Sequence, residues 1–238
     1  MYNLPTIYHS MSDTAQIHSP GIMTTHWPTT IDDAKKMQIA LRDRVIKENQ
    51  FDTVSFVAGV DVGFEEGGSI TRAAVAILSY PELAFVEKSI YRLKTTFPYI
   101  PGYLSFREAP AILEALSKVL QVPDLILCDG QGLAHPRQFG IACHIGVLTD
   151  IPCIGVAKSR LVGTYVEPGQ TKGEWSELSQ HNTCIGAVLR TRSNVKPLYI
   201  SIGHKIDLAT AMSYVLNCTT RYRLPETTRW AHKLASGK

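Results

Sequence analysis

The spacing of apolar residues changes along the chain, and these changes predict where helices and strands lie. The first regular pattern is helical, with apolar residues among charged ones at Ala34, Met37, Leu41 and Val45. Thr30 is suited to be the N-cap of this helix, and Asp33 stands three positions later, at N3. We therefore expect an amphipathic helix that begins near Thr30.

Strand-like runs follow this helix. Runs rich in β-branched and aromatic residues, separated by glycine or proline, cover residues 54–61, 73–80 and 85–93. With a glycine-rich turn at 65–69, they predict an antiparallel meander. Two prolines and a glycine exclude regular structure from 98–103, which we expect to be a rigid loop before a helix at 105–120.

The second half of the chain predicts an α/β arrangement. Short apolar runs predict strands at 125–129 and 153–156, with a mostly buried helix at 139–148 between them. The later predicted elements are a hairpin of 184–190 and 198–202, and closing helices at 208–216 and 228–234. We expect one mixed sheet, an antiparallel meander plus parallel strands, with helices on both faces. Residues 30–238 are predicted to be a single domain and 1–29 a loose leader.

Composition adds few constraints. Of the 238 residues, 45% are hydrophobic, as in ordinary globular proteins, and no apolar run is long enough to span a membrane. The N-terminus lacks the pattern of a secretory signal, so we expect a soluble, cytoplasmic protein. The formal net charge of +3 permits a polyanionic partner without indicating one. Five cysteines without a CxxC pair, mostly inside apolar runs, predict reduced core residues rather than disulfides or zinc ligands.

The stretch Asp124–Arg137 has the character of a binding site rather than of a packing element. It is a short apolar run that ends on Asp129 and is followed by Gly130 and Gly132. A carboxylate at the tip of a strand faces a cleft, and glycine lets the backbone approach a ligand closely. His135 follows without helical or strand periodicity. We therefore expect this strand end to bind a ligand.

Asp61 lies in another apolar strand, where an unpaired charge would be costly. If the first and fourth predicted strands are neighbours, Asp61 and Asp129 lie side by side, and Glu108 of the helix at 105–120 can complete an oxygen cage. Close carboxylates repel unless a divalent cation compensates them, and oxygen ligands suit Mg²⁺ or Mn²⁺. The alternative is that Asp61 ends its strand and caps the next turn.

Lys158 closely follows the predicted strand at 153–156. A metal ion held by carboxylates suits phosphodiester hydrolysis, because it lowers the pKa of a bound water and shields the charge on the phosphate. A lysine at this place can contact the scissile phosphate or position the water. The alternative is a solvated surface lysine, the usual state of this residue type.

Several separated motifs resemble the endonuclease V family, in the order in which that family has them. They are VDVGF at 60–64, PYIPG at 98–102, LSFRE at 104–108, DGQGLAHPR at 129–137 and GVAK at 155–158. Similarity runs from about residue 32 to 236 and includes SIGHK at 201–205 and YRLPE at 222–226. The leader before Thr30 departs from the family, whose members usually begin close to the first helix.

The resemblance implies a ribonuclease H-like fold and a Mg²⁺-dependent DNA repair endonuclease in which Mn²⁺ can substitute. Such enzymes recognise deoxyinosine, which is deaminated adenine, and hydrolyse the second phosphodiester bond 3′ to it, leaving 3′-hydroxyl and 5′-phosphate ends. Motif matching implies a catalytic group of Asp61, Glu108, Asp129 and Lys158, in which the three acids also bind the metal. His232 matches a weaker, auxiliary metal position.

The resemblance also implies how the lesion is read. Tyr99 matches the family's wedge, whose ring fills the gap left by the extruded base. Hypoxanthine carries an oxygen acceptor where adenine has an amino donor, so backbone N–H groups at glycines can distinguish the two. The base-binding set expected from the motifs is Tyr99, Gly102, Leu104, Gly130, His135 and Gly155. The alternative is that Tyr99 packs within its loop and that the glycines only form turns.

Two other functions stay open on the sequence. One is an inosine-specific endoribonuclease, and the other is a protein that binds deaminated nucleic acid without cutting it. The three acids argue against the second, because phosphate would be bound more easily without them. We expect a monomer that acts on inosine-containing DNA, single- or double-stranded, and that needs no membrane and no obligatory protein partner.

Overall fold

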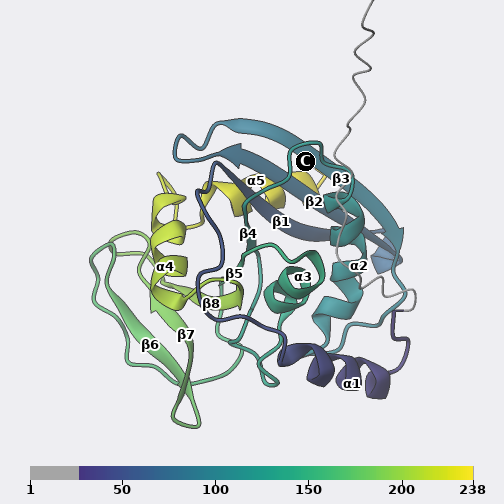
Figure 1. The fold of residues 1–238 in the computed structure, drawn as a ribbon, viewed down its shortest axis with the longest axis horizontal. Coiled ribbons are helices and arrows are strands. Elements are labelled where there is room, and N and C mark those ends of the chain that lie inside the picture. Colours follow the sequence, from purple (N-terminus) through teal and green to yellow (C-terminus); the bar gives the residue numbers. More distant parts are fainter. Residues whose placement is uncertain (1–26, 238) are drawn as a thin grey trace, which may run out of the picture.

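The computed structural model describes residues 27–237, so the predicted leader at 1–29 lies outside the described residues except for its last three. The fold is built on an eight-stranded sheet with strand order β3-β2-β1-β4-β5-β8-β7-β6 (Figure 1). The strands are β1 (Phe56–Glu65), β2 (Ile70–Ser79), β3 (Phe85–Lys94), β4 (Leu125–Cys128), β5 (Cys153–Ala157), β6 (Trp175–Gln180), β7 (Thr183–Leu189) and β8 (Leu198–His204). The helices are α1 (Ile31–Arg42), η1 (Glu66–Gly68), α2 (Leu104–Leu116), α3 (Ile141–Thr149), α4 (Leu208–Asn217) and α5 (Glu226–Ala235).

The predicted mixed sheet is confirmed. Strands β1, β2 and β3 pair antiparallel in sequence order, with η1 in the first turn. Strand β4 is parallel to both β1 and β5, whereas β5, β8, β7 and β6 pair antiparallel. The first and fourth strands are therefore neighbours, as is needed for Asp61 and Asp129 to lie side by side.

Several element boundaries differ from the predictions. Thr30 is the N-cap of α1, as predicted, and its hydroxyl accepts a hydrogen bond from the Asp33 amide at 3.2 Å. That helix ends at Arg42, so Val45 packs from the following turn. Strand β6 was not predicted, because Leu178 is the one fully buried residue of this polar edge strand and no alternation shows.

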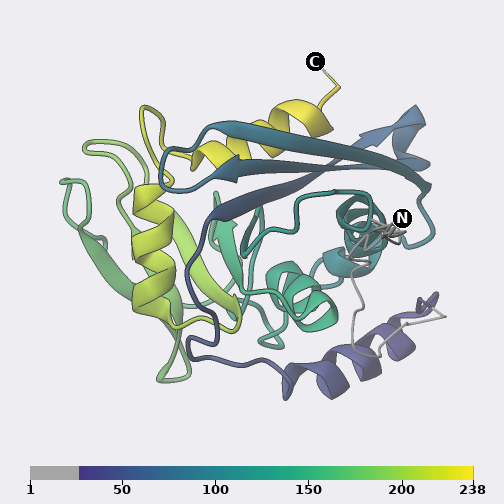
Figure 2. The same cartoon turned by 45° about the horizontal axis from the view of Figure 1, so that its top comes forward.

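Helices cover both faces of the sheet (Figure 2). Helices α2 and α3 pack on one face, where Ile112 and Ile145 join alternate side chains of β1 and β2. Helices α4 and α5 pack on the other face, where Met212 and Val215 of α4 meet β4 and β5. Because successive strand residues point to opposite faces, each central strand contributes to both cores. The buried residues of β1, β4 and β5, at 57–60, 125–128 and 153–157, are accordingly all apolar.

Helix α5 lies unusually close to β1. A Cβ atom on Gly59 would be 2.1 Å from the Thr227 carbonyl oxygen, and one on Gly63 would be 2.3 Å from the Ala235 carbonyl oxygen. Both glycines lie on the sheet face that α5 covers, and Asp61 lies between them with the same orientation. Because neither glycine has a side chain, the backbone of α5 can pack directly against β1 on both sides of Asp61.

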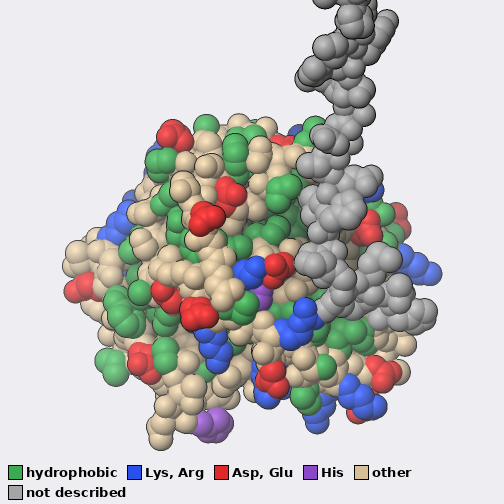
Figure 3. All heavy atoms as spheres, in the orientation of Figure 1, with side chains coloured by type: hydrophobic (Ala, Val, Ile, Leu, Met, Phe, Trp, Pro, Cys, Tyr) green, Lys and Arg blue, Asp and Glu red, His purple; other side chains and the backbone are tan. Residues whose placement is uncertain are grey.

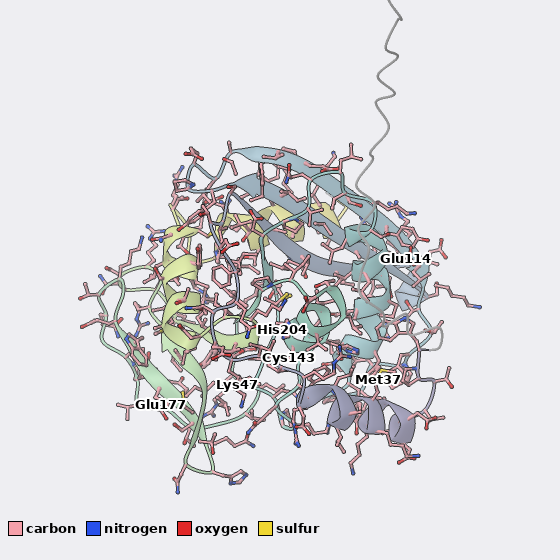
Figure 4. The ribbon with its side chains drawn as sticks, viewed as in Figure 1. Met37, Lys47, Glu114, Cys143, Glu177 and His204 are labelled. Carbon is pink, nitrogen blue, oxygen red and sulfur yellow. The ribbon has the colours of Figure 1, made fainter. Side chains whose placement is uncertain are left out.

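Helix α1 packs on the outer side of α3. Leu41 of α1 joins Phe139 and Cys143 in one apolar cluster, against which Met37 also packs (Figure 4). All five cysteines are free thiols, and four are buried, as predicted. The prediction of a core position is wrong for Cys184, which lies in the exposed first residues of β7. On the face seen in Figure 3, acidic and basic side chains are interspersed. Within residues 27–237, no helix is long and apolar enough to cross a bilayer.

The contact of α5 with β1 predicts a large effect of adding one methyl group. Gly59→Ala should lower the free energy of unfolding by about 3 kcal/mol, the upper end for overpacking, because a backbone carbonyl cannot move aside as a side chain can. Urea denaturation measures this change. Gly173→Ala is the control, because that turn glycine has no neighbouring atom within 4 Å and only its φ of +94° disfavours a side chain, which should cost about 1–2 kcal/mol. Equal losses in the two variants would contradict the close contact.

Candidate active site

Two carboxylates meet where β1 and β4 run parallel. Val60 pairs with Cys128, so Asp61 in β1 and Asp129, the residue directly after β4, lie side by side. One side-chain oxygen of each, together with a ring nitrogen of His232, forms a group whose atoms all lie within 4.8 Å of one another. Strand β1 continues to Glu65, so Asp61 does not end its strand.

Each of these carboxylates is paired with a cationic or polar partner. His232 Nδ1 lies 2.8 Å from Asp61 Oδ2, and Lys158 forms an ion pair with Asp129. Burial raises the pKa of Asp61, the charge of Asp129 raises it further, and the hydrogen bond with His232 acts in the opposite direction. Two negative side chains thus lie close together at this end of β1 and β4, and Lys158 and His232 compensate their charge only in part.

Glu108 approaches the same charges from α2. Its carboxylate is outside the close group of Asp61, Asp129 and His232. Burial raises the pKa of Glu108 to about 8, and the negative charges of Asp61 and Asp129 add to this effect. A carboxyl group with so high a pKa is poised to lose its proton when a cation arrives.

The residues present suit a divalent cation. Carboxylate oxygens with one imidazole nitrogen are ligands that Mg²⁺ or Mn²⁺ accepts, whereas a zinc or copper site would draw on more nitrogen or sulfur. Burial raises the pKa values of Asp61 and Glu108, and the neighbouring negative charges raise them further, so a bound cation would favour the ionised acids. His232, the weaker candidate from the motifs, belongs to the close group with the two aspartates, whereas Glu108 does not.

A cavity of about 360 Å³ adjoins the acids. Its walls contain both Asp129 and Lys158, and Tyr99 stands at its rim with 70% of its surface exposed. Four of the expected base-binding residues also line it, namely Gly102, Leu104, Gly130 and His135. The remaining wall residues are Pro101, Ser105, Gln131, Gly140, Ile141, Ala157, Ser159, Arg160 and Leu161.

Gly155 does not line this cavity. It lies in β5 between β4 and β8, and a Cβ atom there would be 2.4 Å from the Gly132 amide nitrogen. Gly132 in turn contacts β8, because its Cβ would be 2.0 Å from the Ile202 carbonyl oxygen. These two glycines allow the sheet to pack closely against the loop after β4.

His135 lines the cavity but uses both ring nitrogens within the protein. Its Nδ1 accepts a hydrogen bond from the Arg137 amide, so the neutral ring carries its proton on Nε2, which donates to the Gly102 carbonyl. Burial lowers the pKa of His135 to about 4, and the nearby Arg137 contributes to the shift. The ring is therefore neutral, and neither nitrogen is free for a base.

Sequence reasoning did not single out several wall residues. Gln131 donates to the Ser159 carbonyl at 3.0 Å, and its buried Oε1 has no hydrogen-bond partner in the part of the chain that the structure describes. Ser105 and Gln131 could have been predicted as site residues, because they lie inside the motifs LSFRE at 104–108 and DGQGLAHPR at 129–137. Ile141 carries no such signal, because it is one apolar residue of a mostly buried helix.

Comparisons with known proteins agree with the arrangement. The family model described as Endonuclease V matches residues 39–233. An endonuclease V from Rippkaea orientalis is 59% identical over 211 residues, which cover 89% of this chain and 92% of that protein. The crystal structure of endonuclease V from Streptomyces avermitilis superposes with a TM-score of 0.85 and 41% identity, and covers 89% of this chain and 93% of that one.

A further solved structure contains nucleic acid. It is endonuclease V from Ciona intestinalis in complex with a 24mer DNA containing an inosine followed by a ribo-adenosine. It superposes with a TM-score of 0.77 and 29% identity, covering 87% of this chain and 96% of that one. The likeness to these structures establishes the ribonuclease H-like fold. A family model across most of the chain, close relatives of matching length and a shared fold together establish that the chain belongs to the endonuclease V family.

Proposed function

We propose that this protein is a DNA repair endonuclease that recognises deoxyinosine and hydrolyses the second phosphodiester bond 3′ to it, leaving 3′-hydroxyl and 5′-phosphate ends. The observation that carries the proposal is that the acidic cluster and the cavity meet at the end of β4. Asp129 is one of the clustered acids, Lys158 forms an ion pair with it, and both line the cavity. An extruded base in the cavity therefore brings its own backbone to the acids.

In this proposal Asp61, Asp129 and Glu108 hold a divalent cation, Mg²⁺ or Mn²⁺, and His232 assists them. Such a cation, when bound, lowers the pKa of a water molecule and offsets charge on the phosphate. Lys158 now pairs with Asp129, and once that carboxylate has another cation the ammonium group is free to contact the phosphate.

The cavity suits a flipped purine in size and chemistry. Its walls combine an apolar side, with Leu104 and Ile141, and backbone groups at Gly102 and Gly130. Tyr99 at the rim is the proposed wedge, because an exposed aromatic ring can replace the stacking that the duplex loses when a base leaves it. Recognition of the lesion is proposed to come from the backbone, since the His135 ring nitrogens are already occupied.

The second candidate function is cleavage of inosine-containing RNA. The Ciona complex holds DNA in which a ribo-adenosine follows the inosine, so a ribose next to the lesion fits at least one relative. Cleavage rates on matched DNA and RNA strands distinguish the two functions. Tight binding of inosine DNA without cleavage in Mg²⁺ or Mn²⁺ would instead support the non-cleaving binder.

The metal assignment predicts a loss of cleavage in isosteric variants. Asp61→Asn and Asp129→Asn should each lower the nicking rate on inosine-containing duplex with Mg²⁺ by at least about 100-fold, or about 2.7 kcal/mol of transition-state stabilisation. Asp52→Asn changes an exposed aspartate and is the matched control. If the two variants nick as fast as the control, the acids do not bind the metal.

The raised pKa of Glu108 predicts a link between pH and metal affinity. Below its pKa of about 8 the carboxyl group holds a proton that a bound cation must displace, so metal affinity rises with pH by up to about tenfold per unit. At limiting Mg²⁺ the nicking rate should climb as pH approaches 8, and saturating Mg²⁺ should move the midpoint to lower pH. Identical pH profiles at the two Mg²⁺ concentrations would contradict this role of Glu108.

The wedge assignment predicts an effect on binding rather than on chemistry. Tyr99→Ala should weaken binding of inosine DNA by about tenfold, because stacking on an aromatic ring is lost, while single-turnover nicking at saturating enzyme stays close to the parent rate. Tyr99→Phe keeps the ring and should bind as the parent does. Equal affinities of the alanine variant and the parent would remove Tyr99 from recognition.

A further inference from the structure

The carbonyl oxygen of Gly102 accepts hydrogen bonds from three side chains. Gln38 Nε2 and His135 Nε2 each lie 3.0 Å from it, and Arg137 Nη2 also donates to it. A carbonyl oxygen has two lone pairs, so three donors exceed what this atom needs for its own solvation. The convergence therefore holds the backbone at Gly102 in one place.

Gln38 makes its contacts from α1, outside the wall of the cavity. Its side chain is 1% exposed, and Nε2 also donates to the Phe139 carbonyl at 3.3 Å, while Oε1 accepts from Arg137 Nε. The reverse amide orientation would direct an oxygen at two carbonyls and a nitrogen at a guanidinium. The orientation of the amide is thus determined, and all of its polar atoms are used.

Arg137 connects these groups from the loop after β4. Its Nε and Nη2 donate to Gln38 and to Gly102, and its guanidinium lies over the Tyr103 ring, 4.1 Å from the centroid. Gly102 has φ +80°, and a Cβ atom there would be 2.8 Å from Arg137 Nη2. The planar, forked guanidinium suits this double contact, which a single ammonium group cannot make.

These contacts hold one end of the segment 98–102, which we call the wedge loop. Tyr99 is 70% exposed, so contacts of its own ring do little to position it. The Tyr103 amide donates to the Ile100 carbonyl at 3.0 Å and closes the turn, and Pro98 and Pro101 restrict the backbone on either side. The position of the ring therefore depends on the backbone, and the backbone is held at Gly102.

We propose that Gln38 and Arg137 are positioning residues that hold the Gly102 carbonyl and thereby present Tyr99 at the rim of the cavity. The proposal rests on the wedge role proposed above for Tyr99. Neither residue lines the cavity, and the hydrogen bonds of their side chains go to Gly102, Phe139 and each other rather than to the acids. Loosening them should therefore lower the affinity for the lesion and leave bond cleavage in the bound complex unchanged.

The first experiment separates binding from chemistry. Gln38→Met removes the amide and keeps the length of the side chain, and Arg137→Lys keeps the charge without the fork. Each should weaken binding of inosine-containing duplex about five- to tenfold, within the range of coupled neighbouring groups, with an unchanged single-turnover rate at saturating enzyme. Ala40→Met places the same new side chain on the exposed face of α1 and should bind as the parent does.

A double-mutant cycle with Tyr99→Ala tests whether the two residues act through the wedge. In that background Gln38→Met and Arg137→Lys should weaken binding less than twofold further, because the group that they position is gone. A full additional loss in the Tyr99→Ala background would overturn the proposal, since it would indicate that the two residues act other than through Tyr99, by way of the Gly102 backbone itself, general destabilisation or direct contact with DNA. Unchanged affinity of Gln38→Met and Arg137→Lys in the parent would overturn it as well.

The cycle also distinguishes this proposal from the proposed function. If Tyr99→Ala alone leaves the affinity for inosine DNA unchanged, the wedge role fails, whatever Gln38 and Arg137 do. If Tyr99→Ala weakens binding and the other two variants do not, the wedge role stands and the positioning role fails. Thermal unfolding of each variant, compared with Ala40→Met, shows whether a loss of affinity follows a loss of folded protein.

Discussion

The close approach of α5 to β1 is the constraint on which the acidic cluster depends. Gly59 and Gly63 leave no room for side chains, so the helix backbone rests on the strand on both sides of Asp61. His232 reaches Asp61 across a helix–strand contact that larger residues would prevent. Two small residues in a core strand thus determine the geometry of a charged group that neither of them touches.

The second constraint is electrostatic. Parallel pairing of β1 and β4 brings Asp61 and Asp129 together, and α2 adds Glu108. Burial raises the pKa of Asp61 and of Glu108, and the neighbouring negative charges raise it further. Lys158 and His232 offset the charge only partly, which is what a site for an exchangeable divalent cation requires.

Much of the fold could be predicted from the sequence because its core strands are continuous apolar runs and its helices have clear periodicity. Asp61 and Asp129 could be predicted as site residues, because each is a carboxylate inside or at the end of such an apolar run. Strand β6 could not be predicted, because an edge strand needs few buried residues. The packing role of Gly155 could not be predicted either, because the sequence does not distinguish a glycine that packs against backbone from one that contacts a ligand.

The three donors to the Gly102 carbonyl also bear on how the chain folds. Gln38 is 64 residues from Gly102 in sequence, and Arg137 is 99 residues from Gln38. Contacts between such distant residues close large loops of chain, and the entropy of that closure makes them form after local helices and hairpins. The part of the protein that meets a base is therefore held by contacts that can form only when segments far apart in the sequence have come together.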